Sequence, residues 1–250
     1  MTHQAYGPLV GVPRILQLLK DYKLRATFFC PGFTADRYPQ VVEQVLQAGH
    51  EVAHHSYSHR LQISMPEEQQ YADFVRALES LRRLGAKPRG FRAPMWEATW
   101  LTPTILARHD FLYDSSLMDD DRPYLLKIGE KQIVELPPHW SLDDWEQYAF
   151  LPEPAIGAVI ESPAKVFEMW SLELEAMRRH HSLFMLTCHP FLSGRPGRVE
   201  MMRRLIEFIL DKGDVKICTA EEVATSALAD PSLPRRELRP VAAPADVYPD

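Results

Sequence analysis

The 250-residue sequence has few cysteines, no excess of positive charge and no long apolar run. Its three cysteines, Cys30, Cys188 and Cys218, lie within or at the end of apolar stretches, where cysteine is more often a small buried hydrophobe than half of a disulfide. The 28 Lys and Arg are outnumbered by 34 Asp and Glu, so the formal net charge of -6 excludes the basic surface that attracts nucleic acid or anionic lipid. We therefore expect no nucleic-acid partner and a reducing environment.

The chain also lacks segments that direct a protein into or across a membrane. No stretch reaches the ~20 consecutive apolar residues of a membrane span, and Met1–Arg14 has no basic end followed by an apolar core. We expect no membrane partner and a cytoplasmic location. Hydrophobic residues make up 46% and charged residues 25% of the chain, which is typical of one packed domain of enzyme size.

Short apolar strands alternate with amphipathic helices along most of the chain. The predicted strands are 26–30, 51–53, 90–92, 111–113, 133–136, 183–188 and 215–218. The predicted helices are 12–22, 39–48, a long helix opened by a Ser64/Glu67 capping box, 102–109, 164–179, 199–212 and a last helix opened by a Thr219/Glu222 capping box. This order predicts an α/β fold of about seven parallel β/α units, arranged as a (β/α) barrel rather than an open sheet.

The ends of this domain and its longest loops are marked by composition. Residues 230–250 contain five prolines, which exclude regular helix and predict an extended C-terminal arm after a barrel domain of residues 1–229. Residues 119–131 and 141–162 show no clear period, so we expect long loops over one mouth of the barrel.

Four of the ten histidines fall between positions 50 and 59. His55 and His59 are four residues apart, so a helical turn after the strand would place both imidazoles on one side, where their nitrogens could converge on a metal ion such as zinc. The same spacing also arises by coincidence on surfaces and in cores. The pair is a candidate metal site that needs support from other strand ends.

Three further strand ends carry candidate site residues, and reactive groups of a β/α barrel lie where its strands end. Arg92 could fix a carboxylate, or be a surface residue before a turn. Asp114 could orient Arg92 or a histidine, or cap its own loop. His189 ends a buried strand before Pro190 and is a candidate general acid. Cys188 as a nucleophile is disfavoured, because adjacent strand residues point to opposite faces.

Taken together, these residues resemble the polysaccharide deacetylase family with NodB homology, carbohydrate esterase family four. The resemblance is carried by His55-x-x-x-His59, Arg92-x-Pro94, Asp114-Ser115-Ser116 and His189-Pro190, in the family's order over about residues 10 to 225. The text around them, including Phe28–Gly32 and Glu135-Leu136-Pro137, most resembles the non-secreted subgroup of peptidoglycan deacetylases and allantoinase-like proteins.

By this resemblance, His55 and His59 would bind Zn²⁺ or another divalent metal, and His189 would protonate the leaving amine. Arg92 and Asp114 would support them as catalytic residues. The family begins with a strand that ends in an aspartate, both base and third metal ligand, whereas here no Asp or Glu precedes Asp21. We therefore expect an incomplete barrel without its first strand, weak metal binding, and a reading frame truncated at its start, or else a protein that has lost its base.

The leading functional hypothesis is a metal-dependent hydrolase of a non-peptide C–N bond that deacetylates an N-acetylated sugar or a related small amide. Trp96 and Trp140 are candidate substrate-binding residues, although aromatic residues of long loops often only pack. The alternatives are a metal-independent hydrolase of cyclic ureides, as in allantoinase-like members, and an inactive binding protein. We expect a homo-oligomer, because the subgroup associates and the arm has no core of its own.

Overall fold

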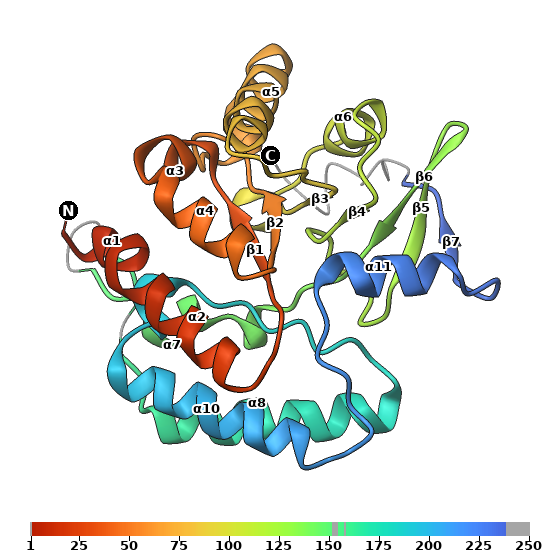
Figure 1. The fold of residues 1–250 in the computed structure, drawn as a ribbon. Helices are drawn as coiled ribbons and strands as arrows, with labels where there is room; N and C mark the ends of the chain where they lie inside the picture. The colour runs from red at the N-terminus through yellow and green to blue at the C-terminus, as the bar shows by residue number, and fades with distance from the viewer. Residues whose placement is uncertain (1, 152–154, 158, 239–250) are drawn as a thin grey trace.

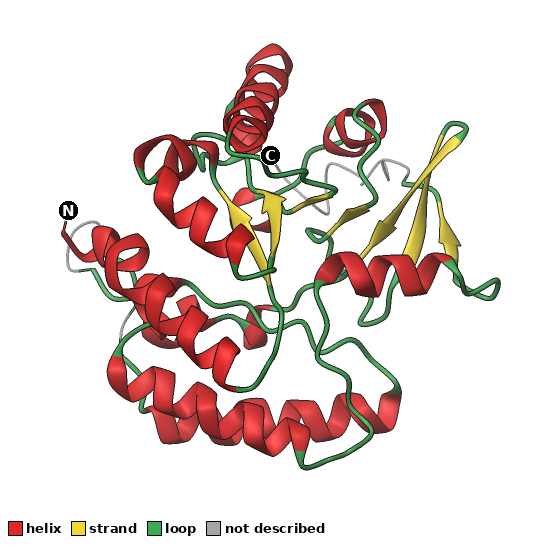
Figure 2. Ribbon diagram, in the orientation of Figure 1, coloured by secondary structure: helices red, strands yellow, loops and turns green. Residues whose placement is uncertain are grey.

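The computed structural model describes residues 2–151, 155–157 and 159–238, in which helices surround a set of short strands (Figures 1 and 2). The strands are β1 (Thr27–Cys30), β2 (Glu51–His54), β3 (Gly90–Phe91), β4 (Tyr113–Asp114), β5 (Tyr124–Ile128), β6 (Lys131–Glu135) and β7 (Arg235–Arg236). The α-helices are α1 (Thr2–Tyr6), α2 (Val12–Asp21), α3 (Gly32–Arg37), α4 (Pro39–Gln47), α5 (Glu67–Arg83), α6 (Thr102–Arg108), α7 (Asp144–Tyr148), α8 (Pro163–His180), α9 (Pro190–Ser193), α10 (Pro196–Leu210) and α11 (Ala220–Leu228). Shorter helical turns are η1 (Gly7–Gly11), η2 (Gln62–Ser64), η3 (Pro94–Trp96) and η4 (Trp140–Leu142).

The strands form one sheet in the order β1-β2-β3-β4-β6-β5-β7, and every pair is parallel except the β5–β6 hairpin. The α/β prediction is therefore confirmed. Within the described part of the chain, β1 and β7 are the two edge strands, so the sheet is not closed (Figure 2).

The register of the parallel strands brings the predicted site residues to one edge of the sheet. Cys30 pairs with His54, His54 with Phe91, Phe91 with Asp114, and Asp114 with Glu135. Because parallel strands end at the same edge, the residues that follow β2, β3 and β4 lie beside one another.

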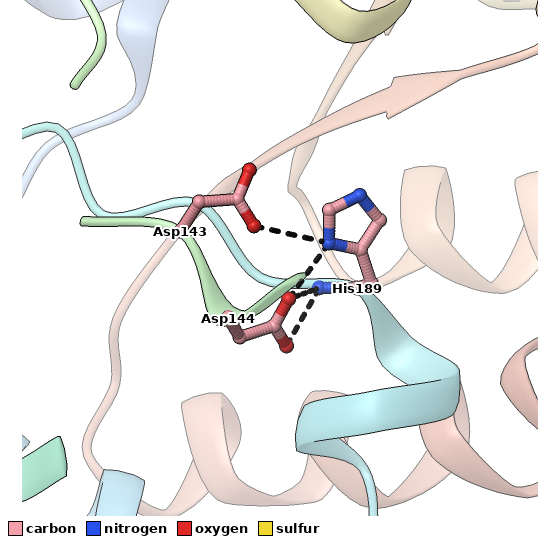
Figure 3. A group of neighbouring side chains, drawn as sticks. All are labelled: Asp143, Asp144 and His189. Atoms are coloured by element: carbon pink, nitrogen blue, oxygen red, sulfur yellow. Dashed lines mark hydrogen bonds and ion pairs between the residues drawn. The ribbon is translucent and has the colours of Figure 1, made fainter. Parts of the chain in front are cut away.

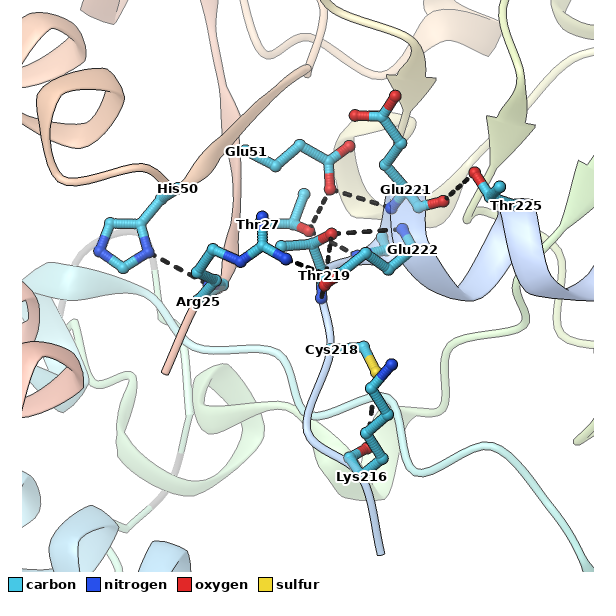
Figure 4. A network of polar contacts seen from close by, with 12 residues as sticks. Arg25, Thr27, His50, Glu51, Lys216, Cys218, Thr219, Glu221, Glu222 and Thr225 are labelled. Carbon is cyan, nitrogen blue, oxygen red and sulfur yellow. Dashed lines mark hydrogen bonds and ion pairs between the residues drawn. The ribbon is translucent and has the colours of Figure 1, made fainter. Parts of the chain in front are cut away.

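At the other end of these strands, where β1 and β2 begin, the sheet contacts the start of α11 (Figure 4). Glu51 accepts hydrogen bonds from the hydroxyls of Thr27 and Tyr113 and from the backbone N–H of Glu221. The capping box at Thr219 and Glu222, predicted from the sequence, is present and satisfies the hydrogen bonds of the first turn of α11.

None of the described helices is both long enough and apolar enough to cross a lipid bilayer.

Two of the predicted strands are wrong. Residues 183–188 make only an isolated bridge between Thr187 and Asp143, and residues 215–218 pair with no described strand. Leu183 donates its backbone N–H to Asp121 and Thr187 donates to Leu142, so this extended segment is held by single contacts with loops. A short apolar run predicts an extended backbone, but a β-strand also needs a neighbouring strand with which it forms a continuous row of backbone hydrogen bonds.

Both predicted loops contain regular structure. Residues 119–131 include β5, whose Tyr124, Leu125 and Leu126 are all buried and therefore do not alternate, and Gly129 with φ of +58° turns the chain into β6. Residues 141–162 include α7, because the Asp143 side chain accepts from the backbone N–H of Trp145 and caps it. Residues 152–154 and 158 of that segment lie outside the described residues.

The predicted Ser64/Glu67 capping box is also wrong. Pro66 is the residue before α5, and the Ser64 hydroxyl donates to the carbonyl of Leu61 instead. In the expected arm, residues 235–236 form β7 and pair with β5 of the same chain, while residues 239–250 lie outside the described residues.

Candidate active site

The loop after β2 carries both histidines of the predicted metal pair. His55 Nδ1 lies 2.7 Å from the backbone carbonyl of Arg92, and the rings of His55 and His59 are 4.9 Å apart between centroids. Ser56 and His59 have φ of +61° and +55°, a left-handed conformation that reverses the chain without a helical turn. The structure thus brings the pair together, although by a tight loop rather than by the helix expected from the spacing.

His189 lies at the start of α9 and is held by a buried carboxylate (Figure 3). Its Nδ1 is 2.7 Å from Asp144 Oδ1 and 3.4 Å from Asp143 Oδ1, and its backbone N–H donates to both oxygens of Asp144 at 2.9 Å. The Ser193 hydroxyl also donates to Asp144. The other ring nitrogen of His189 points away from both carboxylates (Figure 3).

These contacts set the protonation of the three histidines. Burial alone would lower the pKa of His189, but its hydrogen bonds to Asp143 and Asp144 raise it to about 10. Desolvation, followed by the neighbouring charges of other histidines including His189, lowers the pKa of His55 and of His59. At neutral pH the site therefore combines one imidazolium with two neutral imidazoles.

Arg92 is buried and joins three segments rather than a carboxylate. Its guanidinium donates to the carbonyl and hydroxyl of Ser115 and to the hydroxyl of Thr187, and it lies 4.2 Å from the Phe29 ring centroid. Burial lowers the pKa of Arg92 to about 10, which leaves it charged at neutral pH. Arg92 thus fixes the ends of β3 and β4 against the segment that leads to His189.

Asp114 makes the contacts of a loop cap. Its Oδ1 accepts from the backbone N–H of Ser115 at 2.8 Å and from the hydroxyl of Ser116 at 2.6 Å, and it shares no hydrogen bond with Arg92. Glu135, its register partner on β6, accepts from the backbone N–H groups of Ser116 and Leu117. One oxygen of each carboxyl, Asp114 Oδ2 and Glu135 Oε2, is buried without a hydrogen-bond partner.

Trp96 and Trp140 lie against each other with ring centroids 4.4 Å apart at 66°. Trp96 is 8% exposed and Trp140 is 39% exposed. Met95 and Trp96 both have φ of +56°, so the turn after Arg92 holds two consecutive non-glycine residues in a rarely adopted conformation. Such strain is held in place only by surrounding contacts and is common in binding loops.

The sequence reading missed Asp143 and Asp144. Each of the two, with His189, offers a ligand atom within 4.8 Å of the others, an arrangement that could hold a metal ion. However, Asp144 is fully buried and its oxygens already accept from His189 and Ser193, so this group fits retention of a proton better than an ion. In the sequence these residues are an Asp-Asp pair before Trp145, a pattern that indicates the start of a helix and not a functional site.

Comparisons with known proteins identify the family of this chain. Residues 6–113 match the polysaccharide deacetylase family. The peptidoglycan deacetylase of Helicobacter pylori is 32% identical over 246 residues, covering 88% of this chain and 84% of that protein. A solved structure from Mycobacterium smegmatis, assigned to the polysaccharide deacetylases, is 46% identical with a TM-score of 0.93 and covers 96% of this chain and 85% of the other. An allantoinase structure with a TM-score of 0.81 covers 91% of this chain and 75% of the other, and at 24% identity it shows likeness of fold alone. The chain therefore belongs to the polysaccharide deacetylase family, whose members hydrolyse non-peptide carbon–nitrogen bonds.

Proposed function

We propose that this protein is a metal-dependent deacetylase that removes the N-acetyl group from an amino sugar of a glycan. The observation that carries the proposal is the arrangement of His189, which Asp143 and Asp144 hold in the charged form with one ring nitrogen turned away from both carboxylates. Relatives that are named peptidoglycan deacetylase support an N-acetylated glycan as the substrate class.

His55 and His59 have the chemistry of a two-histidine metal site. A backbone carbonyl only accepts hydrogen bonds, so the contact with Arg92 places the proton of His55 on Nδ1 and leaves Nε2 as a ligand atom. Their lowered pKa values keep both rings neutral, the form that binds zinc. Among the described residues no carboxylate forms a three-ligand group with this pair, so we expect weak binding of zinc or another divalent ion.

A divalent ion at this pair would supply Lewis acidity toward the amide carbonyl and toward water. The part assigned to the protein is proton delivery. Water adds to the carbonyl carbon, the carbon–nitrogen bond breaks, and the departing nitrogen takes the proton of His189 Nε2. Of the two protons of the water, one stays on the carboxylic acid and the other returns to His189, so that amide and water yield acetic acid and a free amine. With a pKa of about 10, His189 carries this proton at neutral pH.

The remaining site residues support these three histidines. Arg92 and Asp114 would hold the loops after β3 and β4 that frame His55, acting through the backbone and Ser115 rather than on substrate. Trp140 offers exposed indole surface on which a sugar ring can stack, and the buried Trp96 packs against it. The three cysteines are free, which supports a reducing, cytoplasmic location, and we propose a homo-oligomer.

The test is acetate release from N-acetylglucosamine oligomers and peptidoglycan fragments, with added zinc and after chelation. We expect metal-dependent acetate release that falls about 10²–10⁴-fold in His189→Ala, the usual range for a positioned acid. His180→Ala, an exposed histidine at the end of α8, is the matched control and should act as wild type.

Full activity after chelation, or in His189→Ala, would contradict the proposal, as would no acetate from any N-acetylated glycan. Allantoin is assayed in parallel: metal-independent ring opening would favour the cyclic-ureide hydrolase instead. Binding of glycan without turnover of any substrate would favour an inactive binding protein.

A further inference from the structure

One carboxylate from α5 reaches into the loop between the two histidines. Asp73 accepts hydrogen bonds from the Ser56 hydroxyl, from the backbone N–H of Tyr57 at 2.8 Å and from the backbone N–H of Ser58 at 3.1 Å. These three donors are the residues between His55 and His59. No other described residue accepts from the two backbone N–H groups.

The loop needs such an anchor because its backbone is strained. Ser56 and His59 have φ of +61° and +55°, which residues with a side chain rarely adopt. The φ values at these two positions set the directions in which the imidazoles leave the chain. A conformation of this kind persists only where contacts outside the loop fix it.

The other side of the loop is held by α3. Gly32 donates its backbone N–H to the carbonyl of Ser56 at 2.9 Å, and Phe33 donates to the carbonyl of Tyr57 at 3.1 Å. A Cβ at Gly32 would lie 2.6 Å from the Tyr57 ring and 2.7 Å from Ala77 Cα, so only glycine allows this approach. The carbonyls of the loop are thus fixed by α3 and its amides by Asp73.

We infer that Asp73 is a positioning residue that holds residues 55–59 in the conformation presenting His55 and His59 together. The importance of this role for metal binding rests on the proposed function. The contacts of Asp73 with the loop do not depend on it. Asp73 touches neither imidazole, so it acts through the backbone and not on the metal or substrate. Asp73 is not among the buried residues of α5, which include Phe74, Ala77 and Leu78.

The experiment compares Asp73→Asn and Asp73→Ala with wild type in the full chain. Zinc affinity is measured by calorimetry, and backbone amide hydrogen exchange of residues 56–59 is measured without metal. Asparagine keeps the size of the side chain but can accept on one side only. We expect affinity to fall about 10–100-fold in Asp73→Ala, the usual effect of losing a partner behind a metal ligand, and exchange at Tyr57 and Ser58 to become faster in both variants.

Glu79→Gln, on the exposed face of the same helix, is the matched control and should change neither quantity. Wild-type zinc affinity in Asp73→Ala would overturn the inference while leaving the metal site intact. If wild type binds no zinc, the proposed function fails, and exchange then decides: amides of Tyr57 and Ser58 as slow in Asp73→Asn as in wild type would overturn the inference, and faster exchange would support it.

Discussion

At the scale of single residues, the charge of His189 depends on two carboxylates, Asp143 and Asp144. A folded-state pKa of about 10 lies above the ~6.5 of a free histidine, so the charged ring stabilises the fold fully below pH ~6.5, and this stability is lost as the pH rises through about 10. In Asp144→Asn the main hydrogen-bond partner of Nδ1 loses its charge. We expect the titration midpoint of His189, followed by NMR of its ring, to lie near 10 in wild type and to move to lower pH in Asp144→Asn. A wild-type midpoint near 6.5 would refute this.

Asp114 and Glu135 form a second titrating unit. Burial raises the pKa of Asp114 to about 7 and, together with the charge of Asp114, raises that of Glu135 well above its usual range. Arg92 opposes the shift of Asp114, whereas Asp119 adds to that of Glu135. The folded protein thus keeps a proton that the unfolded chain releases above pH ~4.5, so the free energy of unfolding should fall as the pH rises from ~4.5 through 7.

Glu135→Gln tests this pair. The amide keeps an oxygen for the backbone N–H groups of Ser116 and Leu117 and turns its NH₂ toward Asp114, whose Oδ2 has no hydrogen-bond partner in wild type. We expect the variant to be about 1–3 kcal/mol more stable than wild type at pH 8, the cost of an unsatisfied buried polar group, with little gain at pH 5. Urea unfolding at both values measures it. Equal pH dependence in the two proteins would show that the pair does not share a proton.

At the scale of helices and strands, local patterns predicted what local contacts decide. The apolar stripe of Ile15, Leu16, Leu18 and Leu19 and the capping box at Thr219 were sufficient to predict α2 and α11, because both depend on neighbours within a few residues. Pairing partners are not local. Residues 183–188 and 215–218 are as apolar as β1 yet form no ladder, and β5 was missed because burial on both faces removes its alternation.

The same limit applies to the candidate site. His55 and His189 could be proposed because they stand at the ends of apolar runs, where site residues of parallel folds gather. His59 could be proposed because it lies four residues after His55. Asp144 is 45 residues from His189 and lies in a segment without a period, so only the folded chain shows that it contacts that ring. Asp73 was hidden for another reason, since an acidic residue on an amphipathic helix normally faces solvent.

At the scale of the whole molecule, the open sheet bears on association. β1 is an edge strand whose Phe28 and Cys30 are only partly buried, and β7 is the other edge. Unpaired strand edges favour pairing with another chain. We therefore expect light scattering to detect more than one copy of the full chain, and truncation after Leu228, which removes β7, to change the assembly. A monomer at every concentration would exclude a homo-oligomer, whereas an unchanged assembly after truncation would assign association to another surface.

The double contact of His189 with Asp144 has a consequence for anyone who wishes to retune this enzyme. The carboxylate binds both the ring and the backbone N–H of His189, so acid strength and ring direction cannot be altered separately at that position. A substitution at Asp143 can change the pKa of His189 with less effect on the direction of its ring, because Asp143 lies 3.4 Å from the ring and makes no hydrogen bond to the His189 backbone. Under the proposed role of His189 as the acid, an engineered shift of the pH optimum should therefore begin at Asp143, with a replacement that still caps α7.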